Sequence, residues 1–411
     1  MPMMPSTTKL RTRFTLPFLR AILMFALCWL VPTAFTDKKE KAPQTAQEET
    51  EAAEPKIDTS QLAWPRPPDI ARIRWLAQFK GEPAPPAPAA TGKKKQKWMD
   101  RLAGKRQIDE VKAPHPHILV EPNGVAVDSK GNIYVADTYV GAIFIFNTEV
   151  EKVSFIHNGR EVHFEQVIGL AMDDNDRLFV SDSHLKTIFV FDAAHRMVGS
   201  FGADILERPS GIALDTQNRL LYVTDVVKNQ VAVFDADTFK FQRAIGGPPA
   251  KPGDEDPGTF ARPTNVAVDA KGDIYVSDTI NNRIQIFDAE GNFLSTFGRG
   301  GDGPGYFGRP KGLAVDRDGH IWVADTSMDR VQVFDRKGQL AGYFGVHGTL
   351  PGQFVLPTGV AIDNQNRVMV TEQFKGRLQI FRYITDTEAA AQKADKTASN
   401  AAPSPSAEMK P

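Results

Sequence analysis

The stretch "GDIYVSDTINNRIQIF", residues 272–287, contains two short apolar runs separated by an aspartate and a polar loop. The same arrangement returns in "GHIWVADTSMDRVQVF", residues 319–334. Runs rich in β-branched and aromatic residues, bounded by Gly, Asp and Asn, are typical of strands joined by a turn. Because the pattern recurs, we interpret this hairpin as one part of a repeating unit.

Six copies of the unit can be aligned, and each places an acid at the end of its second run. The acids are 43 to 53 residues apart: Asp137, Asp182, Asp225, Asp278, Asp325 and Glu372. In the fourth copy the β-like runs cover residues 265–268, 274–277, 284–287 and 293–297. Four short strands per repeat are typical of a propeller blade. We therefore predict an all-β fold, a six-bladed β-propeller over residues 115–384.

A circular array must close, and the sixth copy supplies only three runs. Upstream, "RIRWLAQFKG" at residues 72–81 resembles the outer strand "GNFLSTFG" at residues 291–298, with Phe79 in the place of Phe297. We predict that the N-terminal segment 64–82 completes the last blade, because an unclosed ring would expose strand edges. An unrelated terminal strand is the alternative.

The flanking segments differ in composition from the repeats. Residues 1–36 combine basic residues with the apolar run "AILMFALCWLV" (21–31), which is typical of a signal peptide; an uncleaved membrane anchor is the alternative. Residues 37–63 read as a disordered tether, and residues 385–411 as a disordered tail. Residues 83–114 read as a Pro-rich linker and a short basic helix, which docks on the ring or contacts an anionic surface.

The overall composition narrows the classes of function. Lys plus Arg total 49 against 50 for Asp plus Glu, so nothing in the net charge favours nucleic-acid binding. The one cysteine, Cys28, excludes an intramolecular disulfide framework. It follows Leu27, which does not suit a lipoprotein signal. We expect an exported protein, either periplasmic, secreted or anchored to the outer face of the inner membrane.

The six copies resemble NHL repeats in three motifs: P-x-G-(V/I/L)-A-(V/L/I)-D, G-x-I-(Y/W)-V-(A/S)-D and (I/V)-x-(V/I)-F-D. The link "FGRGGDGPGYFGRP", residues 297–310, is also similar to that family. The resemblance implies a six-bladed propeller and, for most members, a binding platform. Some cytoplasmic relatives bind RNA, and a peptide-amidating lyase of this repeat type uses a metal held by central histidines. Fold alone does not decide between these functions.

The strand-end acids have two interpretations. An Asp at such a position can accept hydrogen bonds from loop N–H groups, which explains one acid per blade. The other interpretation is an acid-lined opening that holds a cation such as calcium. Basic residues follow the acids and can pair with them, with loop carbonyls or with a ligand: Lys186, Lys228, Arg283, Arg330 and Arg377. These acids and bases are the predicted ligand-binding face.

The histidines give little sign of a metal centre. There are eight, and His184, beside Asp182, is the best single candidate. A catalytic zinc needs about three protein ligands, and no set of histidines recurs at equivalent blade positions. The longest link, residues 246–263, is either a solvated loop or a partner site.

We therefore expect an exported, non-catalytic scaffold that binds a protein, an envelope component or a ligand through its loops, without nucleic acid. No cofactor is expected, although a central Ca or Zn ion is compatible with the pattern. The alternative is a metal-dependent lyase or lactone hydrolase with an ion at the propeller centre.

Overall fold

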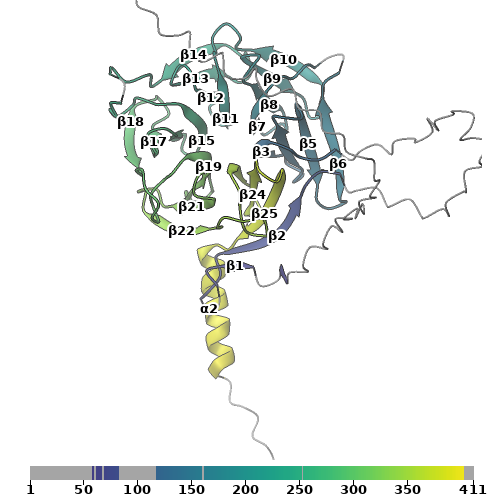
Figure 1. Ribbon diagram of the computed structural model, residues 1–411, viewed down its shortest axis with the longest axis vertical. Helices are drawn as coiled ribbons and strands as arrows, with labels where there is room; N and C mark the ends of the chain where they lie inside the picture. The colour runs from purple at the N-terminus through teal and green to yellow at the C-terminus, as the bar shows by residue number, and fades with distance from the viewer. Residues whose placement is uncertain are drawn as a thin grey trace, which may run out of the picture. The chain divides into compact units, whose positions relative to one another are not determined.

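The computed structural model describes residues 58–59, 62–66, 69–82, 117–159, 162–251 and 253–401, with side chains up to residue 394. The predicted leader, the linker with its basic helix, and nearly all of the tether lie outside these residues. The described strands form six antiparallel sheets. Figure 1 shows them around a common axis, with β3, β7, β11, β15 and β19 innermost. The chain is a six-bladed β-propeller, as predicted.

Each blade is a meander of successive strands from the axis outward. Blades one and two are β3 (Pro122–Val127), β4 (Ile133–Asp137), β5 (Ala142–Asn147), β6 (Lys152–His157), β7 (Val167–Met172), β8 (Leu178–Asp182), β9 (Thr187–Phe191) and β10 (Met197–Phe201). Blades three and four are β11 (Pro209–Asp215), β12 (Leu220–Asp225), β13 (Gln230–Asp235), β14 (Phe241–Ile245), β15 (Pro263–Val268), β16 (Ile274–Asp278), β17 (Arg283–Phe287) and β18 (Phe293–Phe297). Blade five and the consecutive part of blade six are β19 (Pro310–Val315), β20 (Ile321–Asp325), β21 (Arg330–Phe334), β22 (Leu340–Phe344), β23 (Pro357–Ile362), β24 (Arg367–Glu372) and β25 (Arg377–Tyr383).

The two middle strands of each blade are buried on both faces, because neighbouring blades pack face to face. In blade four every residue of β16 and β17 is buried. A phenylalanine from the link is inserted at several of these contacts. Phe307, fully buried, lies 5.4 Å from the ring of Phe334 in blade five. The outer strand β18 is partly exposed, as expected for the rim of the ring.

Blade six is built from both ends of the described chain. Strand β2 (Ile73–Phe79) pairs antiparallel with β25, and β1 (Ala63–Trp64) adds a fifth strand. Phe79 pairs with Leu378, just as Phe297 pairs with Ile284 in blade four. In Figure 1 the purple β2 lies beside β25. Strand β2 therefore occupies the outer position in blade six that β18 occupies in blade four.

The segment read as a disordered tail begins instead with helix α2 (Asp386–Ala401), so that prediction is wrong for residues 386–401. Thr385 and Glu388 form a capping box, in which the backbone N–H of Thr385 donates to Glu388 (2.8 Å) and the backbone N–H of Glu388 donates to the Thr385 hydroxyl (3.3 Å). Alanines then favour the helix. In the described part of the chain no helix is both long and apolar enough to cross a bilayer.

Candidate binding site

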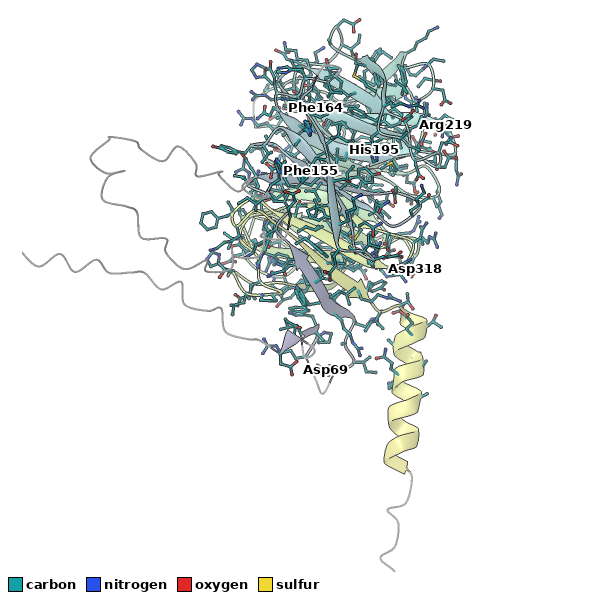
Figure 2. The ribbon with its side chains drawn as sticks, turned by 90° about the vertical axis from the view of Figure 1, so that its right-hand side faces the viewer. Asp69, Phe155, Phe164, His195, Arg219 and Asp318 are labelled. Carbon is teal, nitrogen blue, oxygen red and sulfur yellow. The ribbon has the colours of Figure 1, made fainter. Side chains whose placement is uncertain are left out.

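The ring has two faces of different construction. The loop face carries the ends of the second strands, the links between blades and the beginnings of the inner strands, since Pro122 pairs with Asp137. The hairpin face carries the tight turns between first and second strands. Arg219 and Asp318 belong to two such turns and lie on the same side of the molecule (Figure 2).

The six strand-end acids are fully buried beneath the loop face. Each accepts a hydrogen bond from the backbone of the link that precedes its own blade. The carboxylate of Asp182 accepts from the N–H groups of Glu165 (2.7 Å), Gln166 (3.0 Å) and Leu185 (2.9 Å). The others have equivalent link donors: Val120 and Glu121 for Asp137, Glu207 and Arg208 for Asp225, Ala261 for Asp278, Gly308 and Arg309 for Asp325, and Val355 for Glu372. This geometry supports the turn interpretation.

The burial of these acids has an electrostatic consequence. Desolvation raises the pKa of Asp137 above its ordinary value, while the hydrogen bonds from its loop act in the opposite direction. A carboxylate enclosed in this way has its acceptor positions directed at protein N–H groups. The acids therefore attach links to blades, and ligand binding at them stays a prediction.

The basic residues that follow the acids divide into three kinds. Arg283 donates to its own acid, Asp278, over 2.8 Å, and Arg377 pairs with Glu372 in the same way. Two others cap link carbonyls: Arg330 donates to Gly303 (2.8 Å), and Lys228 to Ile205. Lys186 is exposed on the turn after β8. Four of the five predicted cations therefore hold loops together.

The residue two positions after each acid stands out from the fold into solvent. In four blades it is apolar, and the exposed fractions are 75% for Tyr139, 47% for Val227, 54% for Ile280 and 59% for Phe374. We call these four side chains the apolar rim. The sequence signal for them was present, because the position is fixed relative to each acid. The ligand-binding face predicted from the sequence included the acids and cations of these loops but not these four side chains.

The ring encloses a central channel of about 470 Å³, lined by all six inner strands. Its loop-face end is polar, with these side chains: Glu121, Asn123, Thr138, Gln166, Ser210, Thr264, Asn265, Lys311, Thr358 and Gln373. Several of these side chains form hydrogen bonds to a neighbouring blade. The Thr358 hydroxyl donates to the carbonyl of Pro122 (3.0 Å), and Gln373 donates to both Glu121 and Asn123 (3.2 Å each).

Lys311 differs from its neighbours in the channel. It is the one basic side chain among the described residues that line the channel, and Glu121 is the one acidic side chain. The Lys311 ammonium has no hydrogen bond or ion pair with another described residue. Burial, assisted by the charge of Arg309, lowers the pKa of Lys311 to about 8, and the nearby Glu121 acts in the opposite direction. The sequence reading did not single out this residue.

The histidines do not assemble a metal centre in the described part of the chain. His184 and His163 both face Glu165, at 3.1 and 3.7 Å, but both are largely exposed. Among the described residues no group of three His, Cys, Asp or Glu side chains is arranged to hold an ion. His115 lies outside those residues.

Comparison with known proteins now gives the family. A model of the NHL repeat matches residues 119–146, 260–287 and 307–334. Each range covers the first three strands of a blade, in blades one, four and five. The chain is a six-bladed propeller that contains NHL repeats. Blades one to five of this NHL propeller share the four-strand order, and blade six has the same three inner strands with β2 in the fourth position.

Individual relatives of the NHL propeller match over short regions. It is 40% identical over 101 residues to a probable peptidyl-alpha-hydroxyglycine alpha-amidating lyase of Caenorhabditis elegans, covering 24% of this chain and 28% of that one. It is 57% identical over 44 residues to the protein brain tumor of Drosophila melanogaster, covering 11% of this chain and 4% of that one. The matches thus span about a quarter or less of these relatives.

A solved structure also resembles the NHL propeller. It is a protein of unknown function from Bacteroides thetaiotaomicron, with a TM-score of 0.52 and 16% identity over 64% of this chain and 70% of that chain. At this identity the likeness is one of fold.

Proposed function

We propose that this NHL propeller is an exported, non-catalytic scaffold that binds a partner protein on its loop face. The proposal rests on the apolar rim. Tyr139, Val227, Ile280 and Phe374 project from loop tips at the same position of four blades. Large apolar side chains gathered on one face of a soluble protein are typical of protein-binding surfaces.

The construction beneath the rim supports the same function. The buried acids and their basic partners hold the loop bases rigidly, as Asp278 and Arg283 do in blade four. The loop tips can therefore vary in sequence without loss of the ring, and a rigid base lowers the entropy lost on binding. Export is part of the proposal and is supported by the composition of residues 1–36.

The test compares two matched double variants of the full chain. Tyr139→Ser with Phe374→Ser removes the rim from the adjacent blades one and six. Val198→Ser with Leu294→Ser removes two side chains that are 52% and 50% exposed on the outer strands β10 and β18. A partner captured from the envelope and then purified should bind the outer-strand variant like the wild type. It should bind the rim variant about tenfold or more weakly. Equal binding to all three proteins contradicts the proposal.

The enzyme alternative finds less support in the channel. One relative is named as a probable amidating lyase, but only 28% of it is matched. A divalent cation prefers several oxygen ligands with net negative charge. The described channel offers one carboxylate, Glu121, together with the ammonium group of Lys311. Metal analysis of the purified protein, with thermal unfolding in EDTA, calcium and zinc, tests this alternative.

A further inference from the structure

The central channel is polar at one end and apolar at the other. The fifth residue of every inner strand is alanine: Ala126, Ala171, Ala213, Ala267, Ala314 and Ala361. The sixth is a larger apolar residue: Val127, Met172, Leu214, Val268, Val315 and Ile362. Four of these alanines and five of the larger side chains line the channel, where the larger ones form an apolar zone toward the hairpin face: Ala213, Ala267, Ala314 and Ala361, with Met172, Leu214, Val268, Val315 and Ile362. The channel therefore changes from polar to apolar along its length.

Lys311 breaks the sixfold pattern at the polar end. The second residue of each other inner strand is neutral: Asn123, Ile168, Ser210, Thr264 and Thr358. A lysine that is partly withdrawn from water and makes no ion pair destabilises the fold. An anion at its ammonium group would remove part of that penalty. The position therefore has the properties of an anion site rather than of a structural ion pair.

The surroundings limit the charge of that anion. Glu121, whose charge acts on Lys311, already faces the same end of the channel. With one lysine and one glutamate, the described lining has no net charge, and Arg309, whose charge also acts on Lys311, lies outside that lining. A dianion such as a phosphate monoester would be repelled by Glu121, with one lining cation to offset the repulsion. A singly charged group is the better match. Amide donors such as the side chain of Asn265 are available on the same lining.

We propose that the channel binds a monocarboxylate with a hydrocarbon tail, its carboxylate at Lys311 and its tail among the apolar side chains. The volume of about 470 Å³ lies in the range of small-molecule sites. This inference goes beyond the scaffold function, because it uses the channel and not the apolar rim. Charge-assisted hydrogen bonds fix the head group, and burial of CH₂ groups supplies the rest of the affinity.

The first experiment is titration calorimetry of the full chain at pH 7 with butyrate, hexanoate, octanoate and octanol. Binding of one equivalent is expected, with affinity rising up to about tenfold for each added pair of CH₂ groups. Octanol should bind about tenfold or more weakly than octanoate, because it has no charge for Lys311. An affinity that does not depend on chain length, or octanol binding as tightly as octanoate, overturns the proposal.

Variants then locate the site. Lys311→Met should weaken octanoate binding about tenfold or more, while Lys311→Arg should retain most of it. Lys337→Met, on an exposed turn of the same blade, is the matched control and should bind like the wild type. Thermal unfolding of each variant confirms that the ring is folded. Equal binding by Lys311→Met and the wild type overturns the proposal. The rim variant Tyr139→Ser with Phe374→Ser should bind octanoate normally, so failure of the scaffold proposal and failure of this one are distinguishable.

Discussion

The loop face and the hairpin face each carry one acid at an equivalent position of every blade, and these two sets of six have different roles. On the loop face the acids accept from link N–H groups 16 to 18 residues earlier in the chain. On the hairpin face the acids accept from N–H groups two to four residues later: Asp128, Asp173, Asp215, Asp269, Asp316 and Asp363. The backbone donors of one set come from distant segments, and those of the other close local turns, although Asp173 and Asp269 also pair with an arginine of the neighbouring blade.

The two faces are rigid in different places. A local turn is stabilised mainly by its own residues, so its loss affects one hairpin. A buried acid that holds a link also holds the contact between two blades. The loop tips are then not needed to hold the blades together, and they can present the apolar rim.

The largest effect is expected from breaking a buried ion pair on the loop face. Arg377 is 1% exposed and pairs with the fully buried Glu372, and it also donates to the link carbonyls of Thr349 and Gln353 (2.7 Å each). Arg377→Met should lower the free energy of unfolding by about 3 to 5 kcal/mol, because it leaves a buried carboxylate without its partner. Urea unfolding measures this. A loss below about 1 kcal/mol would mean that the pair does not hold the loop.

A smaller loss is expected when an acid with only backbone partners is removed. Asp182→Ala leaves the N–H groups of Glu165, Gln166 and Leu185 without an acceptor and should cost about 2 to 3 kcal/mol. The matched control is Asp335→Ala on the hairpin face, which frees two local N–H groups and should cost about 1 kcal/mol. Equal losses in the two variants would remove the distinction between the faces.

Lys311, at the loop-face end of the channel, should make the free energy of unfolding rise with pH. The folded pKa of Lys311 is about 8, below the ordinary 10.5, so the unfolded chain binds more protons between these values. Lys311→Met should therefore be more stable than the wild type at pH 7 by about 1 to 3 kcal/mol. The gap should close as the pH approaches 10.5. Urea unfolding at pH 7 and pH 10, with Lys337→Met beside it, measures the gap. A gap that widens with pH would contradict the burial of this ammonium group.

The hairpin face should respond to pH weakly and with the opposite sign. The hydrogen bond of His320 to Asp316 (2.9 Å) raises the pKa of His320 above its ordinary 6.5. A raised histidine pKa stabilises the fold below pH 6.5, and the contribution is lost as the pH rises through the folded value. Relative to His320→Gln, the wild type should lose under about 1 kcal/mol between pH 5.5 and pH 8.5. An unchanged difference would mean that the pair adds nothing.

The sequence predicted the ring well because its signals are periodic. The repeat spacing gave six blades, and the runs at residues 274–277 and 284–287 differ from β16 and β17 by a single residue each. The turn interpretation of the acids agrees with their geometry. Their link partners could not be read locally, because Asp325 and Gly308 are 17 residues apart and meet only after the blade has formed.

Other features were missed although a signal existed. Helix α2 begins within "TDTE" at residues 385–388, a capping box that the Ala- and Lys-rich composition obscured. Lys311 is the second residue of a P-x-G motif. It stands out only when the six inner strands are compared, because the other five have a neutral residue at this position of the channel. The choice of ligand rests on burial and charge in three dimensions, which a linear pattern does not contain.

The pairing of β2 with β25 places a topological constraint on how the protein folds. Ile73 and Tyr383 meet across almost the whole described chain, so blade six is completed only after the other five blades have brought the two segments together. Such long-range contacts slow folding, because loop-closure entropy must be overcome first. During synthesis β2 emerges before the first five blades, and its neighbour β25 emerges after them. Transferring residues 62–82 behind β25 by circular permutation would turn this late, non-local step into a local hairpin.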